Sequence, residues 1–363
     1  MSTPATSSPR TSKHLLAEST WDAEEIQAIQ DVVSSGRFTM GAHVSAFEKA
    51  FAEEIGTRYA VMCNSGSSAN LLMVAAYTLR FEAGTVIAPV LSWPTSYSPF
   101  QQYGWKINFV DIDDSLTLDC IEAKSRAEFY ERSRYAPPVV LAVNILGNAC
   151  EFSHFGYLPP TILEDNCESL GATYQGKRTG SFGVMASHSF FFAHHLSTME
   201  GGMVTTNDEY FYNMLLSLRS HGWTRHLPKD NPLRAKVADF EFIYPGYNVR
   251  PMELQGAIGL KQLAKLEQIV KMRRENAARF PFPKQREIGE SSWFGFAVKK
   301  TEQIERCCET RPVVTGNFLR SPSAKYYRVL NPNDAFPVAD RITDEYVYIG
   351  NHGRPIDWAQ VFR

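Results

Sequence analysis

The 363-residue chain carries 37 lysine and arginine side chains and 39 aspartate and glutamate side chains, and neither sign gathers into a long run. This nearly neutral charge excludes the basic surfaces that bind nucleic acid or membranes, so we expect a small-molecule ligand. No stretch approaches the roughly 20 apolar residues of a membrane helix, and the six cysteines show neither a CxxC pair nor metal-ligand spacing. We therefore expect a cytoplasmic protein without a metal site.

The chain starts without an apolar signal segment, and Ser, Thr and Pro dominate its first dozen residues. We expect residues 1–15 to be a disordered leader. Two amphipathic helices are predicted after it, at 20–36 and 43–56. The first has Thr20 or Asp22 available as its N-cap.

From residue 59 onward, short β-rich runs alternate with helical segments. The runs lie at 59–62, 85–92, 107–113, 138–145, 161–165, 187–191 and 202–207. This alternation is typical of a mostly parallel sheet covered by helices on both faces. A long helical stretch at 251–280 and a proline-rich tail follow. Because a single core stops growing at roughly 250 to 300 residues, we predict a large α/β domain over 16–240 and a smaller C-terminal domain over 241–363.

A glycine and two serines lie between a predicted strand and a predicted helix. In this segment, CNSGSSANLL, Gly66, Ser67 and Ser68 precede the helix. The free N–H groups and the dipole of a helix N-terminus favour a phosphate group. Taken alone, such a segment is more often an ordinary helix cap.

An acidic residue ends one of the predicted strands. Asp165 follows the apolar run ILE, which places it at the carboxyl edge where open α/β sheets bind ligands. A carboxylate there can pair with a protonated pyridine nitrogen, and Glu168 can reach the hydroxyl of the same ring. Considered singly, Asp165 is also a candidate helix cap.

Two adjacent histidines, His194 and His195, lie with Ser189 between the last two predicted strands, in SHSFFFAHHLSTMEGG. Adjacent histidines pack or cap more often than they catalyse, so these residues carry no function by themselves.

In order and spacing, however, the three elements resemble the DegT/DnrJ/EryC1/StrS sugar aminotransferase family, from about residue 24 to at least residue 257. In that family the phosphate turn reads like GTSAL, the ring acid lies in an IEDAAQALGA-like strand end, and the cofactor lysine lies in an SFxxxKNxxxxxGG-like segment. The resemblance implies the α/β fold of aspartate aminotransferase (fold type I), pyridoxal 5'-phosphate or pyridoxamine 5'-phosphate as cofactor, and a homodimer with shared active sites.

The family lysine is missing from this chain. The pattern places His194 on the lysine and His195 on the neighbouring asparagine, and no lysine occurs between Lys177, in a predicted exposed hairpin, and Lys229. Without a lysine the cofactor has no covalent anchor, and an amino-sugar product cannot be expelled by exchange onto that anchor. A histidine, with an ordinary pKa of about 6.5, can still move protons near neutral pH.

Within the family, this histidine and the segments VNILGNACEF, LSWPTSYSP and RSHGWTRHLP resemble the 3-dehydratases of dideoxysugar and O-antigen pathways. The resemblance implies removal of the C3 hydroxyl from a nucleotide-linked 4-keto-6-deoxysugar, GDP-4-keto-6-deoxymannose. L-Glutamate is the implied amino donor, and 2-oxoglutarate and ammonia are released.

The resemblance also assigns further residues. It implies that Trp93 stacks on the pyridine ring, that Ser67, Ser68 and Ser189 bind the phosphate, and that Asn248 reaches the neighbouring subunit's cofactor. His221 is implied as a further active-site histidine. The alternative is that both residues have only structural roles, Trp93 as a core residue and Asn248 as a turn residue.

Three alternative functions compete with this prediction. Iron-sulfur relatives need four clustered cysteines after the catalytic segment, and this chain has none between Cys167 and Cys307, so we expect no iron-sulfur cluster. An aminotransferase with an unusual amine anchor is one alternative. A noncatalytic sugar or cofactor sensor is another, but a dead site has no need of a phosphate turn, a ring acid and an aromatic stack together.

Overall fold

The structure is a computed structural model that describes residues 13–133, 137–156, 161–231, 234 and 240–363. The helices are α1 (Ala23–Ser35), α2 (Ala42–Ile55), α3 (Gly66–Phe81), α4 (Pro94–Gln102), α5 (Cys120–Arg132), α6 (Glu209–Leu218), α8 (Glu253–Ala278), α9 (Glu302–Cys307), α10 (Pro337–Glu345) and α11 (Trp358–Val361), with short 3-10 helices η1 (Phe152–Phe155), η2 (Phe318–Arg320) and η3 (Ala324–Tyr326). The strands are β1 (Tyr59–Cys63), β2 (Thr85–Pro89), β3 (Lys106–Val110), β4 (Val139–Val143), β5 (Thr161–Asp165), β6 (Thr173–Tyr174), β7 (Lys177–Arg178), β8 (Met185–Ser189), β9 (Gly202–Thr206), β10 (Gly295–Lys299) and β11 (Tyr346–Gly350).

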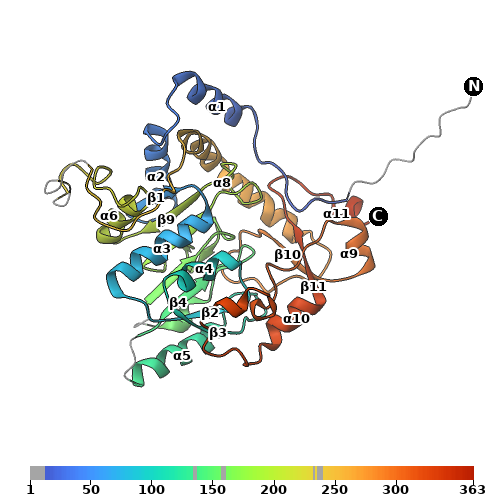
Figure 1. Ribbon diagram of the computed structural model, residues 1–363. Coiled ribbons are helices and arrows are strands. Elements are labelled where there is room, and N and C mark those ends of the chain that lie inside the picture. Colours follow the sequence, from blue (N-terminus) through green and yellow to red (C-terminus); the bar gives the residue numbers. More distant parts are fainter. Residues whose placement is uncertain (1–12, 134–136, 157–160, 232–233, 235–239) are drawn as a thin grey trace, which may run out of the picture.

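A seven-stranded sheet in the order β1-β9-β8-β5-β4-β2-β3 forms the centre of the molecule (Figure 1). The pairs β2–β3, β2–β4, β4–β5 and β5–β8 are parallel, whereas β9 runs antiparallel to both β1 and β8. The predicted mostly parallel sheet is therefore confirmed, with β9 as its one reversed strand.

Alternate residues of the strands face opposite sides of this sheet. In β1, Val61 and Cys63 belong to the hydrophobic cluster that contains the apolar face of α3. Ala60 and Met62 belong to the cluster formed with residues of α2 and α8. Because side chains alternate along a strand and both faces are covered, these strands are buried on both sides.

The carboxyl ends of the parallel strands meet at one edge of the sheet. In the register, Val143 at the end of β4 lies opposite Asp165 at the end of β5, and Asp165 lies opposite Ser187 of β8. The loops that carry the phosphate turn, the ring acid and the histidines therefore open toward the same edge.

The helices before the sheet pack against the long helix after it. Both α1 and α2 contact α8, and Figure 1 shows the three grouped at one end of the molecule. Asp22, rather than Thr20, caps α1 in a capping box with Glu25. The buried carboxylate of Glu25 accepts hydrogen bonds from Gln262 (2.8 Å) and Lys265 (2.7 Å), which joins α1 to α8.

The predicted leader at residues 1–15 includes three residues that the structure describes. Residues 1–12 lie outside the described residues, but residues 13–15 are held in place, which corrects the predicted leader end at residue 15. The N–H of His14 donates to Cys307 O (2.8 Å), and the N–H of Glu309 donates to His14 O (2.8 Å). Backbone pairing with a distant segment holds these residues, and composition alone does not show such pairing.

The C-terminal region has its own small sheet, in which β10 and β11 run antiparallel beside α9 to α11. The division of the chain at residue 240 stays a prediction.

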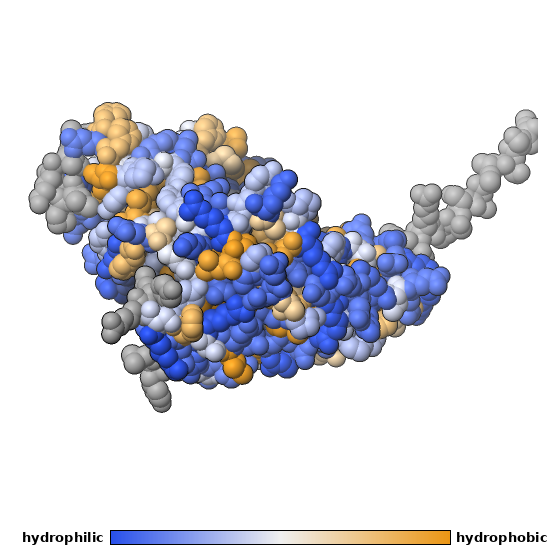
Figure 2. Space-filling model, turned by 60° about the horizontal axis from the view of Figure 1, so that its bottom comes forward, coloured by the Kyte–Doolittle hydropathy of each residue, from blue (hydrophilic) through white to orange (hydrophobic). Residues whose placement is uncertain are grey.

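In the described parts of the chain, no helix has the length and apolar character needed to cross a bilayer. On the face shown in Figure 2, hydrophilic residues predominate and hydrophobic residues form small separate groups.

Candidate functional site

A cavity of about 480 Å³ lies at the carboxyl edge of the central sheet. Its walls come from the loops after β1, β2, β4, β5 and β8 and from the C-terminal region. The sequence-predicted residues that it brings together are Gly66, Ser67, Trp93, Asp165, Glu168, Ser189 and His194.

Two helix N-termini converge at one end of the cavity. The Oγ of Ser67, in the first turn of α3, lies 2.8 Å from the Oγ1 of Thr95 in the first turn of α4. A Cβ added to Gly66 would lie only 2.5 Å from the Cβ of Ser189, so α3 begins directly against the end of β8. The hydroxyl groups of Ser67, Thr95 and Ser189, together with the helix dipoles, form a bed suited to a phosphate group.

The carboxylate of Asp165 is buried beside this bed, with 4% of the residue exposed. It accepts hydrogen bonds from Asn70 Nδ2 (2.9 Å), Ser96 Oγ (2.6 Å) and the N–H of Cys167 (3.1 Å). These donors satisfy part of its acceptor capacity and hold it at the cavity wall, where an ionised carboxylate can still accept a further N–H. A protonated pyridine nitrogen is such a donor.

Glu168, after β5, and Arg311, in the C-terminal region, also line the cavity. Burial raises the pKa of the Glu168 carboxyl, and the positive charge of Arg311 opposes that increase. The guanidinium of Arg311 lies 4.2 Å from the centre of the Tyr348 ring. Among the described residues that line the cavity, Arg311 is the only lysine or arginine, which suits it to bind a carboxylate or a phosphate.

His194 lies in the loop after β8, with its ring 5.1 Å from the ring of Phe294. Its Nδ1 is buried and makes no hydrogen bond in the described structure. Burial lowers the pKa of His194 to about 3, so the imidazole is neutral at pH 7 and able to accept a proton. No lysine is among the described residues lining the cavity, so His194 is its candidate base.

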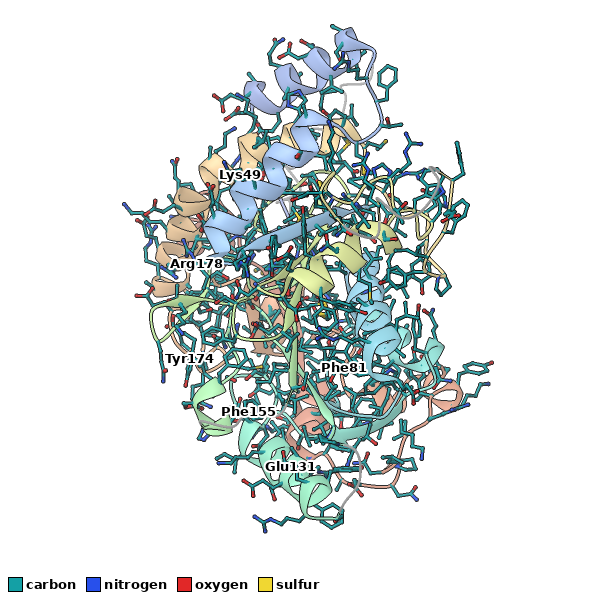
Figure 3. All side chains as sticks on the ribbon, turned by 90° about the vertical axis from the view of Figure 1, so that its left-hand side faces the viewer. Lys49, Phe81, Glu131, Phe155, Tyr174 and Arg178 are labelled. Atoms are coloured by element: carbon teal, nitrogen blue, oxygen red, sulfur yellow. The ribbon has the colours of Figure 1, made fainter. Side chains whose placement is uncertain are left out.

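Lys177 lies elsewhere, in the hairpin of β6 and β7, and its side chain is exposed. Tyr174 and Arg178 of the same hairpin lie at the outer side of the molecule in Figure 3. Arg178 forms an ion pair with Glu54 of α2 (2.7 Å). The hairpin is thus tied to the outer layer of helices, away from the cavity.

Four of the predicted site residues do not line the cavity. Ser68 donates its N–H to the capping oxygen of Ser65, and the buried ring of His195 contacts Ser292 O through Nε2 (3.1 Å). Outside the cavity, His221 is half-buried and Asn248 is exposed. Their two segments are paired by an isolated antiparallel β-bridge between Ser220 and Asn248. Their implied roles stay predictions.

Other cavity residues were not singled out in the sequence. Among them are Leu16, Asn70, Thr95, Ser96, Glu200, Phe294 and Arg311. A buried polar residue such as Asn70, within the otherwise apolar run ANLLMVAA, is the kind of local signal that points to such a role.

The donor set fits pyridoxal phosphate. A hydroxyl-lined bed at two helix N-termini, a buried carboxylate and a neutral base with an unpartnered nitrogen match the phosphate, the ring nitrogen and the reacting carbon of that cofactor. Among the described residues, no cluster of three or more His, Cys, Asp or Glu side chains is placed to hold a metal ion.

Comparison with known proteins agrees with this geometry. Residues 19–353 match the model of the "DegT/DnrJ/EryC1/StrS aminotransferase family". The chain is 44% identical to the GDP-4-keto-6-deoxy-D-mannose 3-dehydratase of Yersinia pseudotuberculosis, with 93% of each protein covered. It is 42% identical to the enzyme of the same name from Escherichia coli O55:H7, with 93% of this chain and 95% of the relative covered.

Solved structures of such a dehydratase share the fold. One with a trapped PLP-glutamate geminal diamine matches with a TM-score of 0.87 and 40% identity, covering 96% of this chain and 100% of that one. Another, with bound GDP-perosamine, gives a TM-score of 0.86 at 40% identity and the same coverage. The aminotransferase PseC of Helicobacter pylori, 21% identical, shares the fold with a TM-score of 0.79. The predicted fold type I architecture is confirmed.

Proposed function

The chain belongs to the DegT/DnrJ/EryC1/StrS aminotransferase family, and we propose that it is a sugar 3-dehydratase dependent on pyridoxal phosphate. Its proposed substrate is GDP-4-keto-6-deoxymannose, which loses the C3 hydroxyl, and L-glutamate is the proposed amino donor. The observation that carries the proposal is that His194 lines a cavity whose polar groups suit the cofactor, and that no described lysine lines this cavity. The names of the similar enzymes support the choice of sugar.

When bound, pyridoxal phosphate would accept the amino group of glutamate, and its aminated form would supply, through the ring, the electron pair that expels the C3 hydroxyl of the sugar. Because none of the described residues that line the cavity is a lysine, noncovalent contacts provide the affinity. Ser67, Thr95 and Ser189 hold the phosphate, and Asp165 keeps the ring nitrogen protonated. Trp93, at the cavity wall and 51% exposed, covers the ring.

His194 moves the proton. As a neutral imidazole it removes a proton from the carbon that carries the cofactor's amino group. The resulting imidazolium then donates that proton to the C3 oxygen, which leaves as water. One side chain thus serves as base and acid in turn.

Arg311 supplies the charge that glutamate requires. It enters the cavity from the C-terminal region and is the only described cation lining it. We therefore assign it to a carboxylate of L-glutamate, which leaves as 2-oxoglutarate before the sugar binds.

The test is one incubation with pyridoxal phosphate, L-glutamate and GDP-4-keto-6-deoxymannose. We expect 2-oxoglutarate, ammonia and loss of the C3 hydroxyl together. An aminotransferase retains nitrogen in the sugar and releases no ammonia, and a sensor forms no 2-oxoglutarate. Either result refutes the proposal.

We also propose that two copies of the chain pair over the cavity mouth. Phe38 (54% exposed) and Met252 (52%) lie side by side, since the N–H of Glu253 donates to Phe38 O. Gln255 bonds to Glu200 O, which brings the exposed Met199 (44%) of the histidine loop toward the same patch. Such a patch of exposed apolar side chains suits a second subunit.

Shared sites have a specific consequence for mixed subunits. If Asn248 serves the partner's cavity, a mixture of His194→Asn and Asn248→Ala proteins regains about a quarter of normal activity, because half of the dimers carry one intact site. Each variant alone stays inactive. If activity does not recover after subunit exchange, the shared site is contradicted.

For the location of the enzyme we propose the cytoplasm, which the six free cysteines support.

A further inference from the structure

Residues 13–21, which we call the strap, precede α1 and adopt neither helix nor strand. The first part is bound to the C-terminal region at several points. Besides the backbone bonds of His14 already described, the N–H of Leu16 donates to Glu309 Oε2 (3.2 Å) and Lys13 Nζ donates to Glu305 O (2.6 Å). The strap therefore follows a defined path.

A pair of histidines holds the strap on the end of β11. The rings of His14 and His352 stack, with centroids 4.5 Å apart. His14 Nε2 lies 2.9 Å from Gly350 O, and His352 Nε2 lies 2.9 Å from Leu15 O. A Cβ on Gly350 would lie 2.1 Å from Leu16 O, so the two backbones touch where β11 ends.

The other end of the strap reaches the histidine loop. Thr20 Oγ1 donates to Gln262 Oε1 of α8 (2.6 Å). The indole N–H of Trp21 donates to the carbonyl oxygen of Ser197, three residues after His194 (3.0 Å). The strap thus joins the C-terminal region to the loop that carries the proposed base.

Between these two anchors, Leu16 is the strap residue that lines the cavity. It packs against the hydrophobic cluster that contains Phe294 and Val314, which also line the cavity. The groups assigned to the cofactor lie on the sheet edge, on α3 and on α4. The wall formed by the strap and the C-terminal region is therefore left for the substrate.

This wall is apolar apart from Arg311. A sugar has few apolar substituents, and a 6-deoxysugar differs from its parent by a methyl group in place of the hydroxymethyl group at C5. A buried hydroxyl facing Leu16, Phe294 and Val314 would lack a hydrogen-bond partner there, which costs free energy, whereas a methyl group would not.

We propose that Leu16, held in place by the strap, packs against the C6 methyl group of the sugar and makes the enzyme selective for 6-deoxysugars. The inference rests on the proposed dehydratase function, because it concerns the second substrate of the same cavity. Leu16 is a specificity-determining residue in this proposal, and the histidine pair is the device that positions it.

The test compares Leu16→Ala with Leu15→Ala, a matched control one residue away whose side chain is 43% exposed and does not line the cavity. Two rates are measured for each holoenzyme: formation of 2-oxoglutarate from glutamate, and release of ammonia with GDP-4-keto-6-deoxymannose. We expect Leu16→Ala to lower kcat/KM for the sugar about tenfold and to leave the glutamate step unchanged. Leu15→Ala should leave both steps unchanged.

A third variant, Leu16→Asn, addresses selectivity directly. It should reduce the preference for the 6-deoxysugar over the same GDP-4-ketosugar with a hydroxyl at C6. Three results would overturn the inference while the proposed function stands. They are an unchanged preference in Leu16→Ala or Leu16→Asn, rates of Leu16→Ala that match those of Leu15→Ala, and equal losses in both half-reactions. A wild-type protein that forms no 2-oxoglutarate refutes the proposed function itself, and the inference with it.

Discussion

In the proposed site, His194 takes the place that a lysine has in related aminotransferases. It is neutral because burial lowers its pKa, and its Nδ1 has no partner among the described residues. A neutral imidazole can accept a proton, as a free lysine amine can, but it cannot form the covalent bond by which a lysine holds the cofactor. The change of residue thus removes the anchor and keeps the base.

The first prediction concerns that base. His194→Asn should retain cofactor binding, because the phosphate and ring contacts come from other residues, and should lower C3 deoxygenation by roughly 10² to 10⁴. Cofactor binding is measured by absorbance and deoxygenation by ammonia release. His195→Asn is the matched comparison, since its ring faces Ser292 outside the cavity. Substantial turnover in His194→Asn would show that His195 or another group is the base.

The missing anchor leads to a second prediction. Borohydride reduction of the enzyme with pyridoxal phosphate should trap no cofactor at the active site, because no described lysine lines the cavity. Mass spectrometry after proteolysis checks this. An adduct on Lys177 that accompanies the loss of activity would contradict both the position of the hairpin away from the cavity and the proposed chemistry.

At the scale of elements, the site depends on how closely α3 approaches the end of β8. Gly66 lies at this contact, and its lack of a side chain lets the helix N-terminus reach Ser189. Asn70, one turn further along α3, bonds to Asp165. A single helix therefore aligns the phosphate bed with the ring acid.

The third prediction tests this contact. Gly66→Ala places a Cβ 2.5 Å from Ser189 Cβ, so α3 must shift, and the affinity for pyridoxal phosphate should fall about tenfold or more. The control is Gly84→Ala, whose Cβ would lie an ordinary 3.7 Å from Trp105. Equal affinities of the two variants in a fluorescence titration would contradict the close contact.

At the scale of the whole molecule, several histidines are buried in the neutral form. Burial lowers the pKa of His188 to about 3 and that of His352 to about 4, from an ordinary 6.5. Between pH 4 and pH 6.5 the unfolded chain therefore binds more protons at these histidines than the folded chain does. Their contribution to stability is lost as the pH falls below 6.5. Buried glutamates such as Glu164, whose pKa is raised, act in the opposite direction.

The fourth prediction isolates one histidine from these opposing contributions. The free energy of unfolding of the wild type should fall between pH 7.5 and pH 5 relative to that of His188→Gln. The difference should approach about 1.4 kcal/mol per pH unit once the pH is below 6.5. Urea denaturation at both pH values measures it. Parallel pH profiles for the two proteins would mean that His188 is not buried in the neutral form.

Local patterns in the sequence determined much of the fold. Helix caps such as Asp22, the apolar alternation of the strands and the order of the three cofactor motifs depend on neighbouring residues, and the structure has the corresponding helices and strands. The strand ends were predicted less well: the run at 85–92 yields a strand that ends at Pro89. Ser92 and Trp93, which follow this strand, line the cavity instead of continuing the sheet.

By itself, the sequence predicted that His194 takes the place of the family lysine and that the phosphate turn and the ring acid are retained. Only the tertiary structure decided what surrounds them. Asn70 and Ser96 meet at Asp165, and Leu16 and Arg311 enter one cavity although 295 positions separate them in the chain. The physical reason is that motifs follow local backbone preferences, whereas contacts across a cavity depend on how the sheet edge, the strap and the C-terminal region pack together.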